Sequence, residues 1–388
     1  MTPLRFDNWR GVLAGPAHSV GMLARRISAR GRRFILRGTG KRIVGVVPVA
    51  PGLSLPTYPH MLASSLSEDD GISTITPKHL PEDSADFLQP FRVRCDTVLL
   101  DISDSGFSFR NRLVLDPEPR VLFTPTISAD AVLAFRRYAP RSLRRLSGTV
   151  AYLSNTWAEN YYHWMQLTLP LLRLYQCLAA GTAIQWYYVG EGHSSRAQAE
   201  TLARANIRQE QVVREPCSGD RMLAAIYSHS PQHGGVLYRD KRGHDFVRAL
   251  FPTSRDDSLP QRIFLLRGPV RTRRVLNEGE LLRLLRRFGF VAVTTDGMTV
   301  ARQAQLFANA KIIVAGHGAA LTNLLFAREG TVVVELFPPN IREASFFAAA
   351  THARAEYYYV IGAPARRAQD FTVPVAKLAA VLNMAGVR

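Results

Sequence analysis

The chain has 388 residues, 47% of them hydrophobic, and a formal net charge of +18. This length and composition predict a globular protein with two or three domains. No run of about 18 apolar residues occurs, so a membrane-spanning helix is not expected. The positive charge predicts an anionic partner, but zinc-finger spacing and an RNA-recognition signature are both missing from the sequence, so nucleic acid is not the expected one.

Residues 1–40 form a basic segment in which Asp7 is the only acid. Apolar residues recur there at roughly helical spacing, at Val20, Leu23, Ile27 and Phe34. The segment fits either a basic amphipathic helix in peripheral contact with an anionic membrane or a solvated tail, and Gly31 favours the tail because it interrupts a short helix. No signal-peptide pattern is present, so we expect a cytoplasmic protein. Three widely separated cysteines fit reduced thiols there: Cys95, Cys177 and Cys217.

Residues 41–147 predict a small β-rich N-terminal subdomain without a motif that carries chemistry. Short apolar runs alternate with proline, glycine and acidic loops. The expected strands are Ile43–Val49, Arg94–Leu100, Phe107–Leu115 and Val121–Phe123. An acidic loop is expected at 67–86, and a connecting helix at Ala129–Tyr138.

Residues 148–255 predict a first Rossmann-like unit, because strands and helices begin to alternate at Gly148. The expected elements are strand Thr149–Leu153, helix Asn160–Leu178, strand Gln185–Val189, helix Ser195–Ala205 and strand Met222–Tyr227. A polar, proline-bounded linker follows at 252–260.

Residues 256–388 predict a second such unit. Its expected strands are Arg262–Leu266, Phe290–Val293, Lys311–Ala315, Thr331–Leu336 and Glu356–Ile361. Its expected helices are Glu278–Phe288, Thr299–Asn309, Ala319–Phe326, Ser345–Ala353 and Val375–Leu382. The predicted fold class is therefore α/β, with two doubly wound units that face a cleft and a β-rich subdomain before them.

The strongest local pattern is a glycine-rich turn, Gly316-His317-Gly318, between a strand and a helix. The first amides of that helix, including the amide of Ala319, are unpaired and suit a phosphate. Glu335 ends the next strand at the same sheet edge, where open α/β sheets bind ligands. The alternative is an ordinary strand–turn–helix with a capping histidine.

Four arginines lie on the loop after the first strand of the second unit: Arg267, Arg271, Arg273 and Arg274. Guanidinium groups match phosphate oxygens, so this loop predicts a pyrophosphate site at the same edge as the His317 turn. A solvated basic loop is the alternative. Asn277 and Glu280 are predicted to cap the following helix.

A dense group of polar and aromatic residues lies where the first strand of the first unit leads into its helix: Glu159, Asn160, Tyr161, Tyr162, His163 and Trp164. Aromatic faces beside amide and imidazole groups suit a sugar. Alternatively, Tyr162 and Trp164 anchor the core and His163 is a residue of the first helical turn. No DxD, HExxH or Walker sequence occurs, so neither a metal nor another cofactor is expected.

Taken together, these motifs resemble glycosyltransferase family 61, the DUF563 group. The resemblance covers about residues 148–388 and rests on three ordered motifs. They are NYYHW at 160–164, the series Arg267, Arg273, Arg274, Asn277 and Glu278, and GHGAALTNLLFA with VVELFPP within 316–339.

The resemblance implies a GT-B enzyme that inverts the anomeric centre without a metal and uses a nucleotide-sugar donor, commonly UDP-linked. It places a donor-binding set in the second unit: Arg267, Arg273, Arg274, His317, Gly318, Ala319, Asn323 and Glu335. It places Asn160, Tyr162, His163 and Trp164 on the acceptor side, facing a glycan or lipid-linked glycan. A role in bacterial surface polysaccharide synthesis is implied in the same way.

We expect the arginines and the amides after His317 to stabilise the negative charge of the phosphates. We expect Glu335 to accept a hydrogen bond from the ribose hydroxyl. His163 is the first candidate for the proton acceptor, because its ordinary pKa lies near working pH, and Glu159 is the second. Two other functions remain open. A nucleotide-sugar epimerase would use the donor site alone, and a polyanion-binding protein would show salt-dependent binding without catalysis.

Overall fold

The computed structural model describes residues 46–48, 61–73, 75–83, 88, 92–103, 108–110, 113–115, 121–123, 143–155, 157–178, 183–191, 195–227, 241–365 and 369–388. The basic segment 1–40 and the helix expected at Ala129–Tyr138 lie outside these residues. Within the described part of the chain, no helix has the length and apolar character needed to cross a membrane.

The C-terminal unit is a five-stranded parallel sheet in the order β12-β11-β13-β14-β15. The strands are β11 (Arg262–Leu265), β12 (Val291–Val293), β13 (Ile312–Gly316), β14 (Val332–Phe337) and β15 (Glu356–Ile361). β13 and β14 are buried over almost their whole length, as strands covered on both faces must be. The expected doubly wound unit is confirmed here.

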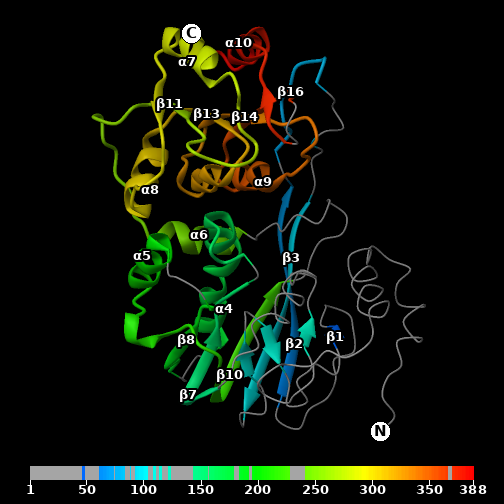
Figure 1. Cartoon of the computed structure of the whole chain (residues 1–388), viewed down its shortest axis with the longest axis vertical. Coiled ribbons are helices and arrows are strands. Elements are labelled where there is room, and N and C mark those ends of the chain that lie inside the picture. Colours follow the sequence, from blue (N-terminus) through cyan, green and yellow to red (C-terminus); the bar gives the residue numbers. More distant parts are fainter. Residues whose placement is uncertain are drawn as a thin grey trace, which may run out of the picture.

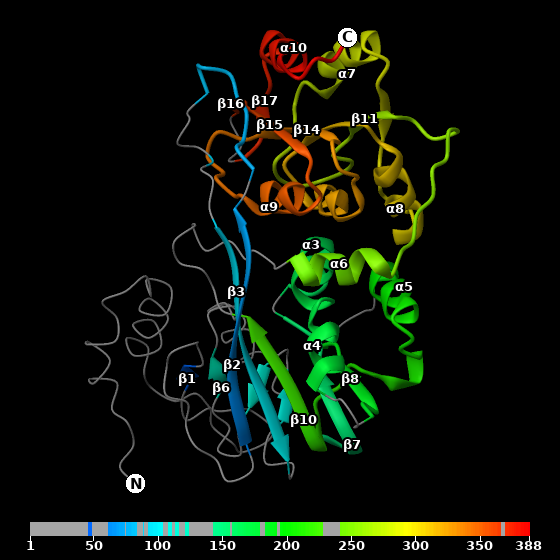
Figure 2. The same ribbon diagram turned by 180° about the vertical axis from the view of Figure 1, so that it is seen from behind.

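Helices cover both faces of this sheet (Figures 1 and 2). Alternate strand residues pack against α7 (Glu278–Arg287) and α10 (Val375–Met384) on one face. The others pack against α8 (Val300–Asn309) and α9 (Ser345–His352). Ala319–Phe326, expected as an α-helix, is a 3-10 helix, η5. It is buried on nearly every side, and the side-chain Nδ2 of Asn323 donates to the Ala320 carbonyl, so packing rather than helical periodicity sets its form.

The second sheet has ten strands and contains the parallel run β10-β7-β8-β9. These strands are β7 (Arg144–Tyr152), β8 (Trp186–Tyr188), β9 (Val212–Val213) and β10 (Cys217–Tyr227). Six strands from residues 46–123 join the same sheet: β1 (Val46–Pro48), β2 (Met61–Ser73), β3 (Arg92–Ser103), β4 (Ser108–Arg110), β5 (Leu113–Leu115) and β6 (Val121–Phe123). The sheet is thus continuous across residue 148, where a boundary between subdomains was expected.

This larger sheet is not wound with helices in the way that the sequence predicted. One face packs against α4 (Leu171–Leu178) and α6 (Lys241–Ala249). Among the described residues, the other face packs against the strands of its own sheet, through Phe109, Tyr152 and Tyr188. β10 is antiparallel to β3 and β4, and this pairing turns a parallel unit into a mixed sheet.

The helix expected at Asn160–Leu178 is divided into three pieces. α3 (Tyr161–His163) continues into a π-helical turn, η2 (Trp164–Thr168), and α4 follows. Pro170 explains the division, because it has no N–H for an α-helical hydrogen bond and displaces the preceding carbonyls. Such π turns are frequent at functional sites.

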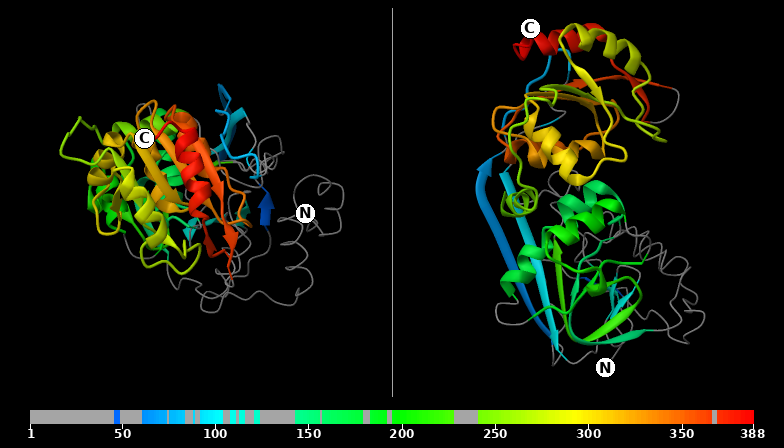
Figure 3. Two further views of the ribbon diagram at one scale, coloured as in Figure 1. Left: turned by 90° about the horizontal axis from the view of Figure 1, so that it is seen from above. Right: turned by 90° about the vertical axis from the view of Figure 1, so that its left-hand side faces the viewer.

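The two sheets lie at opposite ends of the molecule with helices packed between them (Figures 1 and 3). Glu200 of α5 (Arg196–Arg204) accepts hydrogen bonds from Val300 N and Ala301 N, at 2.7 and 2.8 Å. A carboxylate at the N-terminus of α8 is favoured by the helix dipole. Arg248 donates to the Ala327 carbonyl at 3.0 Å, which adds a second connection.

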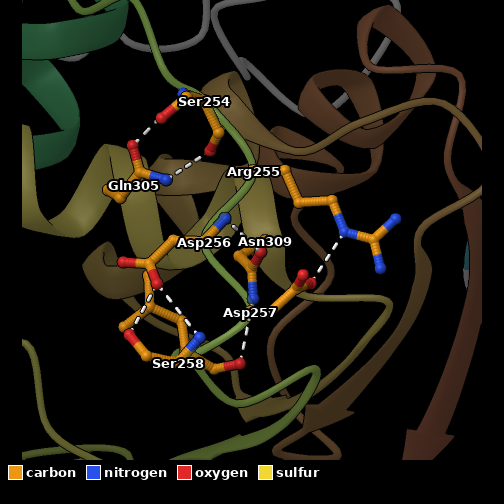
Figure 4. A network of polar contacts seen from close by, with 8 residues as sticks. Ser254, Arg255, Asp256, Asp257, Ser258, Gln305 and Asn309 are labelled. Atoms are coloured by element: carbon orange, nitrogen blue, oxygen red, sulfur yellow. Dashed lines mark hydrogen bonds and ion pairs between the residues drawn. The ribbon is translucent and has the colours of Figure 1, made fainter.

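The linker expected at 252–260 is held against α8 (Figure 4). Gln305 and Ser254 exchange hydrogen bonds, and Asn309 bonds to Asp256 N and to the Leu259 carbonyl. Residues 75–83 make a further connection, because Lys78 bridges β15 at Tyr358. The acidic loop expected at 67–86 is therefore in part the end of β2 and in part the connecting segment 75–83.

Candidate functional site

The candidate site lies where the strand order of the C-terminal sheet reverses. β11 and β13 are neighbours, and the chain proceeds from β11 to one edge of the sheet and from β13 to the other. Open α/β sheets bind ligands at the carboxyl ends of such a strand pair. The loop that contains Arg267 follows β11, and the His317 turn follows β13, so both predicted loops meet at this point.

Arg267 lies directly against the glycine turn. A Cβ atom added to Gly318 would lie 1.5 Å from Nη1 of Arg267. The Gly318 backbone is extended, with φ 171°, so the need for glycine comes from space rather than from backbone strain. The Arg267 backbone is fixed by Glu278, which accepts its N–H at 2.9 Å. The turn and the arginine loop therefore form one surface.

Arg267 and Arg273 have half-buried guanidinium groups with unmet hydrogen-bonding capacity. Among the described residues, neither Nε atom finds a hydrogen-bond partner. Burial lowers the pKa of Arg267 to about 10, the charge of Arg273 acts in the same direction, and Glu278 opposes both. Arg273 also has a positive φ of 59°, which costs about 1 kcal/mol for a residue other than glycine. These features favour an anionic ligand between the two groups.

Arg274 has a different partner from its two neighbours. Its guanidinium donates to Asp370 Oδ2 at 2.7 and 2.9 Å, and its backbone N–H donates to Asp370 Oδ1. Asp370 is buried, so this pair fixes the loop to the segment before β17 (Phe371–Thr372). Asn277, expected to cap α7 through its side chain, instead bonds to Val373 and to the Glu280 side chain.

His317 is buried between two carboxylates. Its Nδ1 donates to Glu335 Oε1 at 2.5 Å, and its Nε2 donates to Glu343 Oε2 at 3.3 Å. Burial alone would lower the pKa of His317, but the hydrogen bonds to Glu335 and Glu343 outweigh burial and raise it. The rings of Phe337 and Phe346 enclose the imidazole at 5.0 and 5.2 Å. The two carboxylates thus fix the orientation of His317 and favour its protonated form.

Glu335 does not occupy the position expected of a ribose ligand. It is fully buried, and its Oε2 accepts the Tyr357 hydroxyl at 2.5 Å while Oε1 holds His317. Burial and the neighbouring Glu335 raise the pKa of Tyr357, so the phenol keeps its proton. Glu335 therefore orients His317, and its carboxylate oxygens are already engaged inside the protein.

Glu343, which the sequence did not indicate, lies between the charged groups of both sides. Its side chain is 50% exposed, which leaves it accessible to a substrate. The hydrogen bond from His317 lowers the pKa of Glu343, against burial, and the charges of His317, Arg273 and His163 lower it further. The carboxylate thus links the donor-side cations to the motif at 160–164.

Two other residues predicted to bind the donor, Asn323 and Ala319, belong to η5. Asn323 is buried, donates to Gln303 Oε1 at 2.7 Å and accepts the Tyr161 hydroxyl at 2.7 Å. It therefore joins η5 to α3 across the two halves of the molecule. Ala319 begins η5 immediately after Gly318, so its backbone is at the turn as expected.

Some residues of the acceptor-side motif lie near the donor side, and another is part of the core. The His163 ring lies 5.3 Å from Tyr162, and Tyr162 lies 5.5 Å from Phe346, which also contacts His317. These contacts bring His163 and Tyr162 to the donor side. Trp164 is buried and donates to Thr201 at 2.8 Å, so it anchors the core.

The turn before α3 supplies the remaining residues of this loop. Asn160 accepts the Tyr162 N–H at 2.9 Å as the cap of α3, and Glu159 is exposed. Trp157, also missed from the sequence, is 45% exposed and packs 5.1 Å from His163. Like Glu343, Trp157 lies after the carboxyl end of a strand in a parallel run, and this position is the signal that indicates the other loops.

Comparison with known proteins finds a family similarity in this region. Residues 161–334 match the family model described as Glycosyltransferase 61. Two curated relatives are similar over 83 residues, which make up 21% of this chain and 14% of theirs. They are Protein O-linked-mannose beta-1,4-N-acetylglucosaminyltransferase 2 of Mus musculus, 39% identical, and of Homo sapiens, 37% identical. The match confirms the resemblance found in the sequence and indicates a glycosyltransferase.

Proposed function

We propose that this chain, a glycosyltransferase by its match to family 61, moves a sugar from a UDP-linked donor to a hydroxyl of a glycan or glycolipid. The observation that carries the proposal is the pair Arg267 and Arg273: both guanidinium groups are half-buried with unmet Nε atoms, and that of Arg267 lies against the Gly318 turn. A diphosphate supplies the oxygens that such groups lack, and its negative charge offsets their mutual repulsion.

The donor side would act mainly through charge. As the sugar leaves the diphosphate, negative charge grows on the phosphate oxygen, and fixed cations stabilise it most when they need not reorganise. Arg267 and Arg273 would bind the diphosphate, while His317, oriented by Glu335, would add a third positive charge. Arg274 is excluded from this role, because Asp370 engages its guanidinium.

The acceptor side would position the attacking hydroxyl. His163 and Tyr162 lie beside the donor cations through Phe346, and aromatic rings pack well on the C–H faces of sugars. Asn160 and Glu159 lie on the same turn. We propose a single displacement with inversion, in which the two substrates bind between the two halves in a GT-B arrangement.

We also propose that no divalent cation is required, because arginines and an imidazolium provide the positive charge that a metal would otherwise supply. Transfer assayed in EDTA is expected to equal transfer without it. Activity that is lost in EDTA and restored by Mn²⁺ would contradict this part of the proposal.

A thermal-shift screen with UDP, GDP, CMP and ADP tests the donor class, because a ligand of the folded state raises the unfolding midpoint. UDP is expected to give the largest shift. UDP-N-acetylglucosamine and a mannoside are the first substrates to assay, since the relatives' names mention this sugar and mannose. Recovery of a changed donor without transfer would favour an epimerase, and no shift with any nucleotide would count against the proposal.

We place the reaction on the cytoplasmic side of a membrane, with peripheral contact, in the synthesis of a surface glycan. The basic residues of the first 40 positions support this placement by their charge. Sedimentation with anionic vesicles tests it. Equal sedimentation of the full chain and of a variant that lacks residues 1–40 would contradict membrane contact through this segment.

A further inference from the structure

We infer that Glu343 is the general base that removes the proton from the acceptor hydroxyl, an inference that rests on the proposed sugar transfer. The carboxylate lies on the segment between β14 and α9, after the carboxyl end of a sheet strand. Active-site groups of parallel sheets are found at this edge. Neither of the two proton acceptors suggested by the sequence, His163 and Glu159, belongs to this segment.

The position of Glu343 meets the requirements for a base in a displacement. Its contact with His317 places it beside the donor cations, and it precedes Phe346 of α9, whose ring lies 5.5 Å from that of Tyr162 on the acceptor loop. The hydrogen bond from His317 engages Oε2, so Oε1 can accept from a hydroxyl. With half of the side chain exposed, a substrate can reach it, and the proton can later pass to water.

The chemical step is a single displacement at the anomeric carbon. The acceptor oxygen attacks the anomeric carbon, and its proton moves to the Glu343 carboxylate. A carbon–oxygen bond forms as the bond between the anomeric carbon and the phosphate oxygen breaks. The electron pair leaves with the nucleoside diphosphate, whose added charge faces Arg267 and Arg273.

The charges around Glu343 also connect its basicity to the donor. In the free protein His317, Arg273 and His163 lower the pKa of Glu343, so the carboxylate is ionised at neutral pH. A bound diphosphate would bring negative charge beside the same cations, which raises the pKa of a neighbouring carboxylic acid. Glu343 would therefore become a stronger base once the donor is bound, which suppresses proton transfer before the donor arrives.

The two other candidates suit different roles. The rings of Trp157 and Tyr162 flank His163 at 5.1 and 5.3 Å, which favours a positioning residue for the acceptor sugar. Glu159 is exposed on the turn before α3. Glu343 has both a fixed hydrogen-bond partner on the donor side and an accessible carboxylate.

The test is Glu343→Gln, which removes the basic carboxylate and keeps its shape. UDP release from UDP-N-acetylglucosamine, with a mannoside or water as acceptor, is expected to fall at least about 100-fold. UDP binding by calorimetry should persist, and the acid limb of the wild-type kcat profile should disappear. Glu329→Gln is the matched control, because Glu329 is exposed and pairs only with Arg354 among the described residues. It should behave as wild type.

Three results would overturn the inference. Near-normal turnover of Glu343→Gln, with His163→Gln inactive, would transfer the role to His163. Loss of UDP binding in proportion to turnover would make Glu343 a binding residue instead. A wild-type protein that neither binds UDP nor releases it from a nucleotide sugar would remove the proposed function itself, and the inference with it.

Discussion

Two regions at the same sheet edge differ in whether their polar side chains find partners within the protein. The network behind the His317 turn is complete within the protein from Tyr357 through Glu335 to His317, and it ends at Glu343, whose Oε1 remains available to a substrate. In the arginine loop, Arg267 and Arg273 place charge in a half-buried position with unmet Nε atoms. A complete network fixes geometry, whereas an incomplete one attracts a ligand.

Arg274 sharpens this contrast, since it adjoins Arg273 in the sequence but belongs with the complete networks. Asp370 holds it through three hydrogen bonds. Removal of Arg267 or Arg273 should therefore weaken ligand binding, whereas removal of Arg274 should lower the stability of the fold.

Arg267→Ala should weaken UDP binding most, by about 100-fold or about 2.7 kcal/mol. The free energy of unfolding should hardly change or should rise, because the charge repelled by Arg273 is removed. Calorimetric titration and chemical denaturation measure the two quantities. Arg255→Ala is the control, since Arg255 is an exposed arginine of the same unit that pairs with Asp257. Equal UDP affinity in the two variants would remove Arg267 from the donor site.

Arg274→Ala should lower the stability of the protein and leave its UDP affinity nearly unchanged. The buried Asp370 would lose the Arg274 guanidinium and keep the Arg274 backbone N–H, at a cost of about 2 kcal/mol in unfolding free energy, reduced from the value for a fully buried pair because Arg274 is 40% exposed. UDP affinity of the folded fraction should stay near that of wild type. Unchanged stability together with lost UDP binding would return Arg274 to the donor set in which the sequence placed it.

Gly318→Ala tests the contact between the two regions. The new methyl group would force the Arg267 guanidinium to move, because the present Nη1 position is 1.5 Å from the added carbon. A flexible side chain can move at little cost in stability, so we expect roughly a tenfold loss of UDP affinity, or about 1.4 kcal/mol. Wild-type affinity in this variant would show that the ligand does not use the observed arginine position.

Glu335→Gln tests the complete network through pH. The pKa of His317 is raised in the folded protein, so its stabilising contribution is fully present below the unfolded value of about 6.5 and is lost as pH rises through the folded pKa. Wild-type stability should therefore decline across that window. The variant should decline less, as measured by denaturation at two pH values on either side of the window. An equal decline in both proteins would show that Glu335 does not hold the His317 proton.

The sequence predicted the C-terminal unit well because its information is local. Runs such as the one in β13 contain enough β-branched residues for two covered faces, and the glycines that follow mark the turn. It did not predict the ten-stranded sheet, since the pairing of β3 with β10 joins residues more than a hundred positions apart. Strand propensity does not specify a partner at that distance.

The same limit applied to the site. The positions of Arg267, Arg273 and His317 followed from the rule that loops after parallel strands meet at one edge. The different fate of Arg274 depends on Asp370, 96 residues further along the chain, and no local pattern indicates that pair. Glu335 was placed at the correct edge, but the inward direction of its side chain depends on Tyr357 in the next strand.

The most direct measurement is the structure of the protein in complex with UDP. The diphosphate is expected within hydrogen-bond distance of the guanidinium groups of Arg267 and Arg273, next to the backbone of Gly318, with Arg274 still paired to Asp370. UDP bound at another sheet edge, or a diphosphate that contacts neither guanidinium group, would contradict the account.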